Sequence, residues 1–181
     1  ALSFTAVIWV LSRWRSEAPV TNLPAERFTS SIRTGLRYVR QSKALHTILL
    51  RGIALFVPMS APLAFLPLVV RTELDQGPEV YGLLLGSVGA GAVLAGLQLA
   101  RLRAAIPADN IIRLGTTGVV IASLALAWVQ QVWILAGAMF LLGGSWISAQ
   151  STLQVTTQLS LPGWVRARGL AVFIATFMGV L

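Results

Sequence analysis

An indole and two side-chain amides recur at one-turn spacing in the most polar of the apolar stretches of this chain. Trp146, Gln150 and Gln154 lie at positions i, i+4 and i+8, which a helix places on one face. An indole stacks on apolar or aromatic groups, and an amide both donates and accepts hydrogen bonds. The spacing predicts one wall of an amphipathic cavity for a large, partly aromatic or apolar solute. The alternative is that the amides bond neighbouring helices and that Trp146 is a packing residue.

No catalytic arrangement accompanies this face. The middle third of each complete apolar stretch lacks an ionisable residue, and the sequence contains no Cys and a single His, His46. Neither a nucleophile with its base nor a pair of carboxylates can be assembled from this set at membrane depth. We therefore expect no enzymatic activity, no metal site and no cofactor.

Two stretches carry helix-disturbing residues near their midpoints. Pro58 and Pro62 flank Met59 and Ser60, and residues 143–144 are both glycine. A proline frees a carbonyl and kinks a helix, and irregular backbone at membrane depth is tolerated only beside protein or a watery cavity. The pattern predicts two interrupted helices near the midplane, which is typical of a transporter binding site. It adds Met59 and Ser60 to the candidate cavity-lining residues.

Four apolar stretches are long enough to cross a membrane. They run 19 to 24 residues and comprise residues 47–70, 80–100, 111–129 and 132–153, and a spanning helix needs about 20. Charged residues make up only 11% of the chain, against roughly 25% in a soluble domain. Shorter apolar stretches, 1–12 and 169–181, meet the two ends of the sequence. The sequence predicts an all-α, polytopic membrane helical bundle that is truncated at both ends.

Basic residues gather on alternate connections between these stretches. All of them except Arg71 lie in residues 13–45, in two short connections, or within about a turn of the spans that leave the same side. The short connections contribute Arg101, Arg103, Arg166 and Arg168. Basic connections stay in the cytoplasm. We therefore expect a multi-pass protein of the cell (inner) membrane, with a cytoplasmic central loop over 13–45 that contains an amphipathic helix over 26–42. Membrane topology accounts for the net charge of +8, so we expect no nucleic-acid partner.

The stretch 80–100 is crowded with small residues. Its glycines are Gly82, Gly86, Gly89, Gly91 and Gly96. In lipid, helices associate through small residues that let their backbones approach. We expect these glycines to lie at helix-packing interfaces, either as a face that slides against a partner half or as static packing.

Three segments carry a family resemblance. They are Arg13-Trp14-Arg15 with the run Gly35-Leu36-Arg37-Tyr38-Val39-Arg40, then Tyr81-Gly82-Leu83-Leu84-Leu85-Gly86, and then Gln158-Leu159-Ser160-Leu161-Pro162-Gly163-Trp164-Val165-Arg166-Ala167-Arg168. With them the chain resembles the second half of a major facilitator superfamily transporter, in the branch of enterobactin exporter-like, secretion-effector and macrolide-efflux permeases.

The resemblance implies the end of helix 6 over 1–12, helices 7 to 10 in the complete spans, and the start of helix 11 at 169–181. In that fold, helices 7 and 10 line a central cavity, and helices 8 and 11 pack between the two halves. The superfamily loop Gly-x-x-x-Asp-Arg-x-Gly-Arg-Arg is matched here by Gly96 and Arg101. Ala100 replaces its acidic residue and Arg103 its second glycine, so the copy is degraded.

These observations together predict a secondary active transporter that exports a moderately large amphipathic solute, such as a siderophore or a drug, by alternating access driven by protons. Its expected partners are the small-molecule substrate, membrane lipid and the missing N-terminal half of the same chain. The alternatives are an uptake permease or a lipid-moving facilitator of the same fold, and a non-transporting membrane scaffold or anchor domain.

Overall fold

The computed structural model describes Trp9, Arg13, residues 42–161 and residues 163–180. The chain forms two units, Ala1–Ser31 and Ile32–Leu181. In the first unit the guanidinium carbon of Arg13 lies 4.2 Å from the centre of the Trp9 ring, which is a cation–π contact. The remainder of the expected span over 1–12, and residues 26–41 of the expected amphipathic helix over 26–42, lie outside the described residues, while Ser42 is the extended N-cap of the first helix described below.

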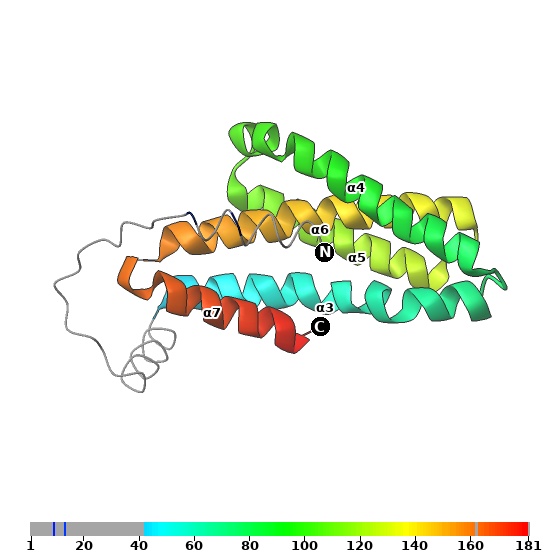
Figure 1. Cartoon of the computed structure of the whole chain (residues 1–181), viewed down its shortest axis with the longest axis horizontal. Helices are drawn as coiled ribbons and strands as arrows, with labels where there is room; N and C mark the ends of the chain where they lie inside the picture. The colour runs from blue at the N-terminus through cyan, green and yellow to red at the C-terminus, as the bar shows by residue number, and fades with distance from the viewer. Residues whose placement is uncertain (1–8, 10–12, 14–41, 162, 181) are drawn as a thin grey trace. The chain divides into compact units, whose positions relative to one another are not determined.

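The described part of the second unit is built from helices and contains no strand (Figure 1). The helices are α3 (Lys43–Thr72), α4 (Pro78–Ala105), α5 (Ala108–Trp128), α6 (Val132–Ser160) and α7 (Gly163–Val180). Four of them, α3 to α6, are long and apolar enough to cross a membrane. The prediction of an all-α, polytopic membrane bundle is therefore confirmed.

The ends of these helices follow from local sequence. Ser42 caps α3 by accepting a hydrogen bond from the Leu45 amide at 3.3 Å. Pro78 occupies the first turn of α4, where its missing N–H costs nothing. Trp128 and Trp133 are 80% and 79% exposed on either side of the short α5–α6 connection. Tryptophans in such positions form the aromatic belt of a membrane interface.

The expected interruptions of two spans are wrong. The helix α3 continues through Pro58, Pro62 and Pro67, and α6 continues through residues 143–144. Lipid contains no water to hydrogen-bond an unpaired backbone group. A helix therefore stays continuous where a neighbouring helix supplies a hydrogen-bond donor or packs closely against the turn. The Pro58 turn of α3 receives a hydrogen bond from α5, and residues 143–144 of α6 pack closely on α4.

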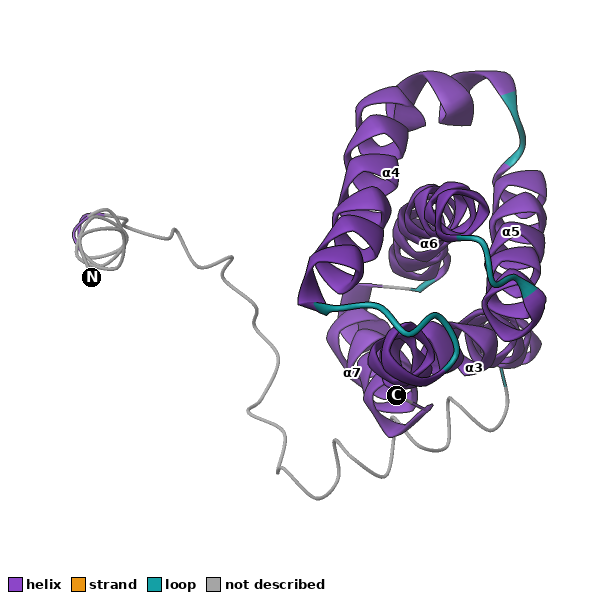
Figure 2. Ribbon diagram, turned by 90° about the vertical axis from the view of Figure 1, so that its right-hand side faces the viewer, coloured by secondary structure: helices purple, strands orange, loops and turns teal. Residues whose placement is uncertain are grey.

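The central helix of the described bundle is α6. It lies between α4 and α5 and also contacts α3 and α7 (Figure 2). Between α4 and α7 the described residues make no contact, so one side of α6 is open between these two helices. The core consists mainly of apolar side chains from α3, α5 and α6, among them Phe56, Val119 and Met139, and also takes in Leu84 of α4 and Phe173 of α7.

Candidate functional site

Trp146, Gln150 and Gln154 occupy one face of α6, as their spacing predicts for a continuous helix. Trp146 and Gln150 are half-buried and Gln154 is exposed. At about 100° per residue, this face points away from the side of α6 that carries Leu141 and Ser145. It therefore borders the opening between α4 and α7.

The Trp146 indole is held in an aromatic cluster from three helices. Its ring centre lies 5.5 Å from that of Phe56 on α3, in an edge-to-face arrangement, and 5.9 Å from that of Phe177 on α7. Phe56 also lies 4.5 Å from Phe177 and 6.0 Å from Phe173. These separations are within the range in which aromatic pairs attract one another. The cluster fixes the orientation of the indole and supports the packing interpretation for the buried part of Trp146.

The two glutamines behave differently from the indole. Within the described part of the chain, neither Gln150 nor Gln154 has a side-chain hydrogen bond to another residue. The alternative that these amides bond neighbouring helices finds no support there. Both amides keep their donors and acceptors available, so this face of α6 can form hydrogen bonds with a solute.

Met59 and Ser60, the other candidate lining residues, are occupied within the bundle. Met59 is 4% exposed and belongs to the hydrophobic core. The Ser60 hydroxyl donates to the carbonyl oxygen of Val57, 2.7 Å away in its own helix. Among the described residues, a cavity wall would therefore be formed by α6 and the rings around Trp146, without Met59 and Ser60.

A residue that the sequence did not single out supplies the hydrogen bond that is missing from the proline turn of α3. Pro62 has no N–H, so the carbonyl of Pro58 loses its usual i+4 donor. The Ser123 hydroxyl of α5 lies 2.8 Å from that carbonyl oxygen, and also 2.8 Å from the Val119 oxygen of its own helix. A serine on another span could have indicated such a hydrogen bond. The sequence alone does not show which span faces Pro58.

The glycines of α4 fall into two groups. Gly91 packs directly on the backbone of α6, where a Cβ would collide with the Phe140 carbonyl. The others lie open, with no described atom within 4 Å of a would-be Cβ; they are Gly82, Gly86, Gly89 and Gly96. Gly91 therefore packs within this bundle, and an interface role for the other four stays a prediction.

Glycines on α5 and α6 also lie at close helix contacts. A Cβ at Gly143 would collide with the Val88 carbonyl of α4. On the other side of α6, a Cβ at Gly115 would lie 2.6 Å from the Ala149 Cβ. Glycines therefore set the close approach of α6 to both neighbours, and residues 143–144 act as packing residues within a continuous helix.

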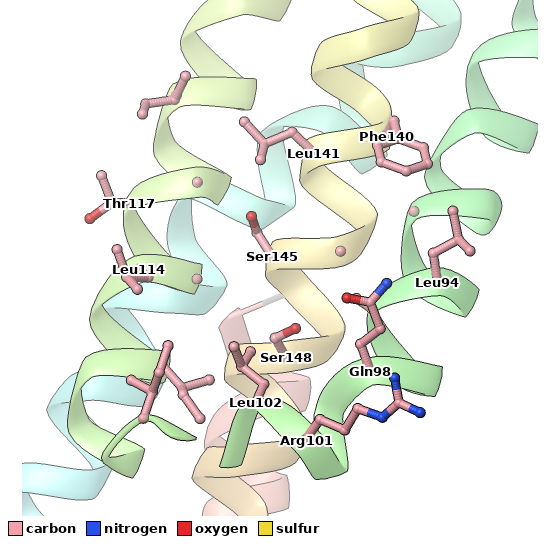
Figure 3. A pocket seen from close by; sticks show the side chains of 18 of the residues that line it. Leu94, Gln98, Arg101, Leu102, Leu114, Thr117, Phe140, Leu141, Ser145 and Ser148 are labelled. Carbon is pink, nitrogen blue, oxygen red and sulfur yellow. The ribbon is translucent and has the colours of Figure 1, made fainter. Parts of the chain in front are cut away.

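A groove of about 870 Å³ lies between α4 and α5, with α6 as its floor (Figure 3). Leu94, Gln98 and Arg101 line it from α4, and Ser145 and Ser148 from α6. A smaller hollow of about 570 Å³ adjoins it at the α4–α5 connection. Neither hollow is lined by Trp146, Gln150 or Gln154.

The match that identifies the family covers the whole length of the chain. Residues 1–181 match the model of the transmembrane secretion effector family of the major facilitator superfamily. The chain belongs to this family. No curated protein and no solved structure matches it. As a secretion effector of this superfamily it is a multi-pass membrane transporter, and such transporters are generally not enzymes.

The arginines of this secretion effector gather at one end of the bundle. There Arg103 of α4 donates through Nε to the Thr152 hydroxyl of α6 at 3.3 Å. Arg51 of α3 contacts both carboxylate oxygens of Asp109 on α5, at 2.7 and 3.2 Å. Arg166 and Arg168 fall within α7, and their side chains lie outside the described residues. Arg103 thus ties α4 to α6, and Arg51 ties α3 to α5.

Proposed function

We propose that this secretion effector exports a moderately large amphipathic solute by alternating access, and that the Trp146–Gln150–Gln154 face of α6 is one wall of its binding site. The observation that carries the proposal is the combination of an anchored indole and two amides without partners among the described residues. Such a wall offers an aromatic surface for stacking and two directed hydrogen bonds. A siderophore or a macrolide-like drug has the size and the mixed polarity to fit this wall.

The open side of the bundle supports this placement. The α6 face borders the gap between α4 and α7, which make no contact with each other in the described residues. The resemblance to major facilitator transporters implies that the corresponding side faces the other half of the molecule across the cavity. The partner in this proposal is accordingly the N-terminal half of the same polypeptide.

Proton coupling and the direction of transport belong to the same proposal. The middle thirds of the four described spans carry no ionisable side chain, so the carboxylate of a proton-coupled cycle is expected in the rest of the transporter. Export follows from the branch that the sequence resembles. An uptake permease or a lipid-moving facilitator would share the fold, and transport in inside-out vesicles with the proton gradient reversed separates these from an exporter.

Efflux of a tricatecholate siderophore and of a macrolide tests the assignment in the full-length transporter. Removing the Gln150 amide in Gln150→Ala loses a hydrogen bond of about 1 kcal/mol, which raises the apparent KM about fivefold for a substrate that uses it. Trp146→Phe retains a ring in the cluster, so we expect a change of substrate range with retained expression. Gln130→Ala, in the exposed α5–α6 turn, is the matched control. Unchanged transport and range for both α6 variants would remove this wall from the binding site.

A further inference from the structure

The groove between α4 and α5 is lined mostly by apolar side chains and carries its one charged lining residue, Arg101, toward one end (Figure 3). At the end of the bundle that holds the arginines, its lining includes Arg101 and Gln98. Toward the middle of the helices the apolar lining continues with Leu94, Leu141 and Phe140. A ligand that matches it carries a polar, negatively charged group at one end and an apolar chain at the other.

Hydroxyl groups lie between these two zones. Ser145 and Ser148 line the groove from α6, and within the described residues neither side chain has a hydrogen-bond partner. Ser148 is 8% exposed, and its hydroxyl oxygen remains accessible from the groove. A hydroxyl left without a protein partner at this depth is satisfied by a ligand or by water. The ester carbonyls of a glycerolipid are acceptors that sit between its headgroup and its chains.

The charge at the polar end suits an anionic headgroup. Arg101 makes no ion pair with any described residue, and Arg113 lines the adjoining hollow together with Asn110. The nearby acid, Asp109, is already bound by Arg51. Basic pockets between spanning helices, at the level of the membrane interface, are typical sites for anionic lipid headgroups.

The size and position of the groove also favour a lipid. Its volume of about 870 Å³ is in the range of sites that take one small molecule. The groove opens between α4 and α5, two helices that are long and apolar enough to cross a membrane.

We propose that this groove binds one anionic phospholipid, with its phosphate at Arg101, its ester groups at Gln98 and Ser148, and an acyl chain along Leu94, Leu141 and Phe140. The site is separate from the α6 face proposed for the transported solute, because the two lie on opposite sides of α6. It adds a bound membrane component to the transporter at the contact between α4, α5 and α6.

Photolabelling of the full-length protein in nanodiscs tests the proposal. The probe is a trace of phosphatidylglycerol with a diazirine in its acyl chain, and labelled peptides are located by mass spectrometry. We expect label on residues that line the groove. Arg101→Gln should lower it about fivefold, the factor expected for one arginine beside an anionic lipid. Leu94→Trp, which fills the apolar zone, should lower it at least as far.

Matched controls lie on the same elements. Leu97→Trp changes the same residue type one turn further along α4, at a position that is 75% exposed and does not line the groove. Arg71→Gln removes an exposed arginine at the other end of the bundle. Both should label like the parent protein. If Leu94→Trp does not fold, Leu114→Trp fills the same groove from α5.

Three results would overturn the proposal. One is equal labelling of the groove-filling variant and the Leu97→Trp control. Another is labelling by phosphatidylcholine with the same acyl chain that matches labelling by phosphatidylglycerol. The third is an unlabelled groove in the parent protein, as expected if another segment of the polypeptide or the transported solute occupies it.

Discussion

The Ser123 hydroxyl of α5 donates a hydrogen bond to the Pro58 carbonyl of α3 at 2.8 Å. That carbonyl is the one from which Pro62 withholds a backbone donor. In a bilayer no water is available to hydrogen-bond an unpaired carbonyl. The contact therefore lets α3 keep a proline pair at mid-length without breaking, and it fixes α3 against α5 at the same point.

The first prediction is that Ser123→Ala destabilises the bundle. The Pro58 carbonyl would be left without its donor, and hydrogen bonds between membrane helices contribute about 0.6 kcal/mol on average and up to about 1.7. The experiment is a double-mutant cycle in which Ser123→Ala is combined with Pro62→Ala. Because Pro62→Ala restores the N–H that can bond Pro58 within α3, Ser123→Ala should cost less in that background. Thermal unfolding of the four proteins in detergent gives the coupling.

Ser87→Ala is the control for this cycle. The Ser87 hydroxyl bonds only the Leu83 carbonyl of its own helix, at 2.9 Å, so its loss should leave unfolding nearly unchanged. If the cost of Ser123→Ala is the same with and without Pro62, the hydroxyl is not compensating for the proline.

The second prediction separates two glycines of α6. Gly143→Ala should destabilise the protein by about 1–3 kcal/mol, the usual cost of overpacking, because the new methyl group would meet the Val88 backbone of α4. Gly137→Ala, two turns earlier, meets no described atom within 4 Å. It should be neutral or slightly stabilising, since alanine favours a helix. Thermal unfolding of the two variants measures the difference, and equal midpoints would contradict the close α4–α6 approach.

The sequence could predict the spans because their apolar runs match the thickness of a bilayer, and it could predict the shared face of Trp146 and Gln150 because helical periodicity is local. It could not show which neighbour each face meets. Gly86 and Gly91 look equivalent in the sequence, yet only Gly91 touches α6. The pairing of Ser123 with Pro58 and the groove between α4 and α5 depend on the angles at which helices cross, which periodicity does not contain.

The third prediction concerns the orientation of the bundle in the membrane. The chain has no cysteine, so single cysteines can be introduced at Asp75, in the α3–α4 connection, and at Ala104, near the C-terminal end of α4, both of which are exposed. The positive-inside rule places the arginine-bearing end in the cytoplasm. An impermeant thiol reagent added to intact cells should therefore label Asp75→Cys and spare Ala104→Cys until the membrane is opened. Labelling of both positions in intact cells, or of Ala104→Cys alone, would contradict this orientation.

The fourth prediction uses the Arg51–Asp109 ion pair, which joins α3 to α5 with a shortest distance of 2.7 Å. Arg51→Asp places two acids together and should lower the thermal midpoint of the reconstituted transporter. The exchange Arg51→Asp with Asp109→Arg restores an opposite-charge pair and keeps the net charge of this end unchanged, so the positive-inside bias is not altered. The rescue should be partial, because Asp109 lies in the first turn of α5, where the helix dipole favours an acid over an arginine.

Salt distinguishes the pair from other effects of the exchange. Both partners are accessible to solvent, so the difference between single and double variants should shrink as ionic strength rises. Midpoints measured in nanodiscs at low and at molar salt give this comparison. A double variant that is no more stable than Arg51→Asp at low salt would show that the two charges do not stabilise the contact between α3 and α5. The α3–α5 contact would then rest on apolar packing and the Ser123–Pro58 hydrogen bond.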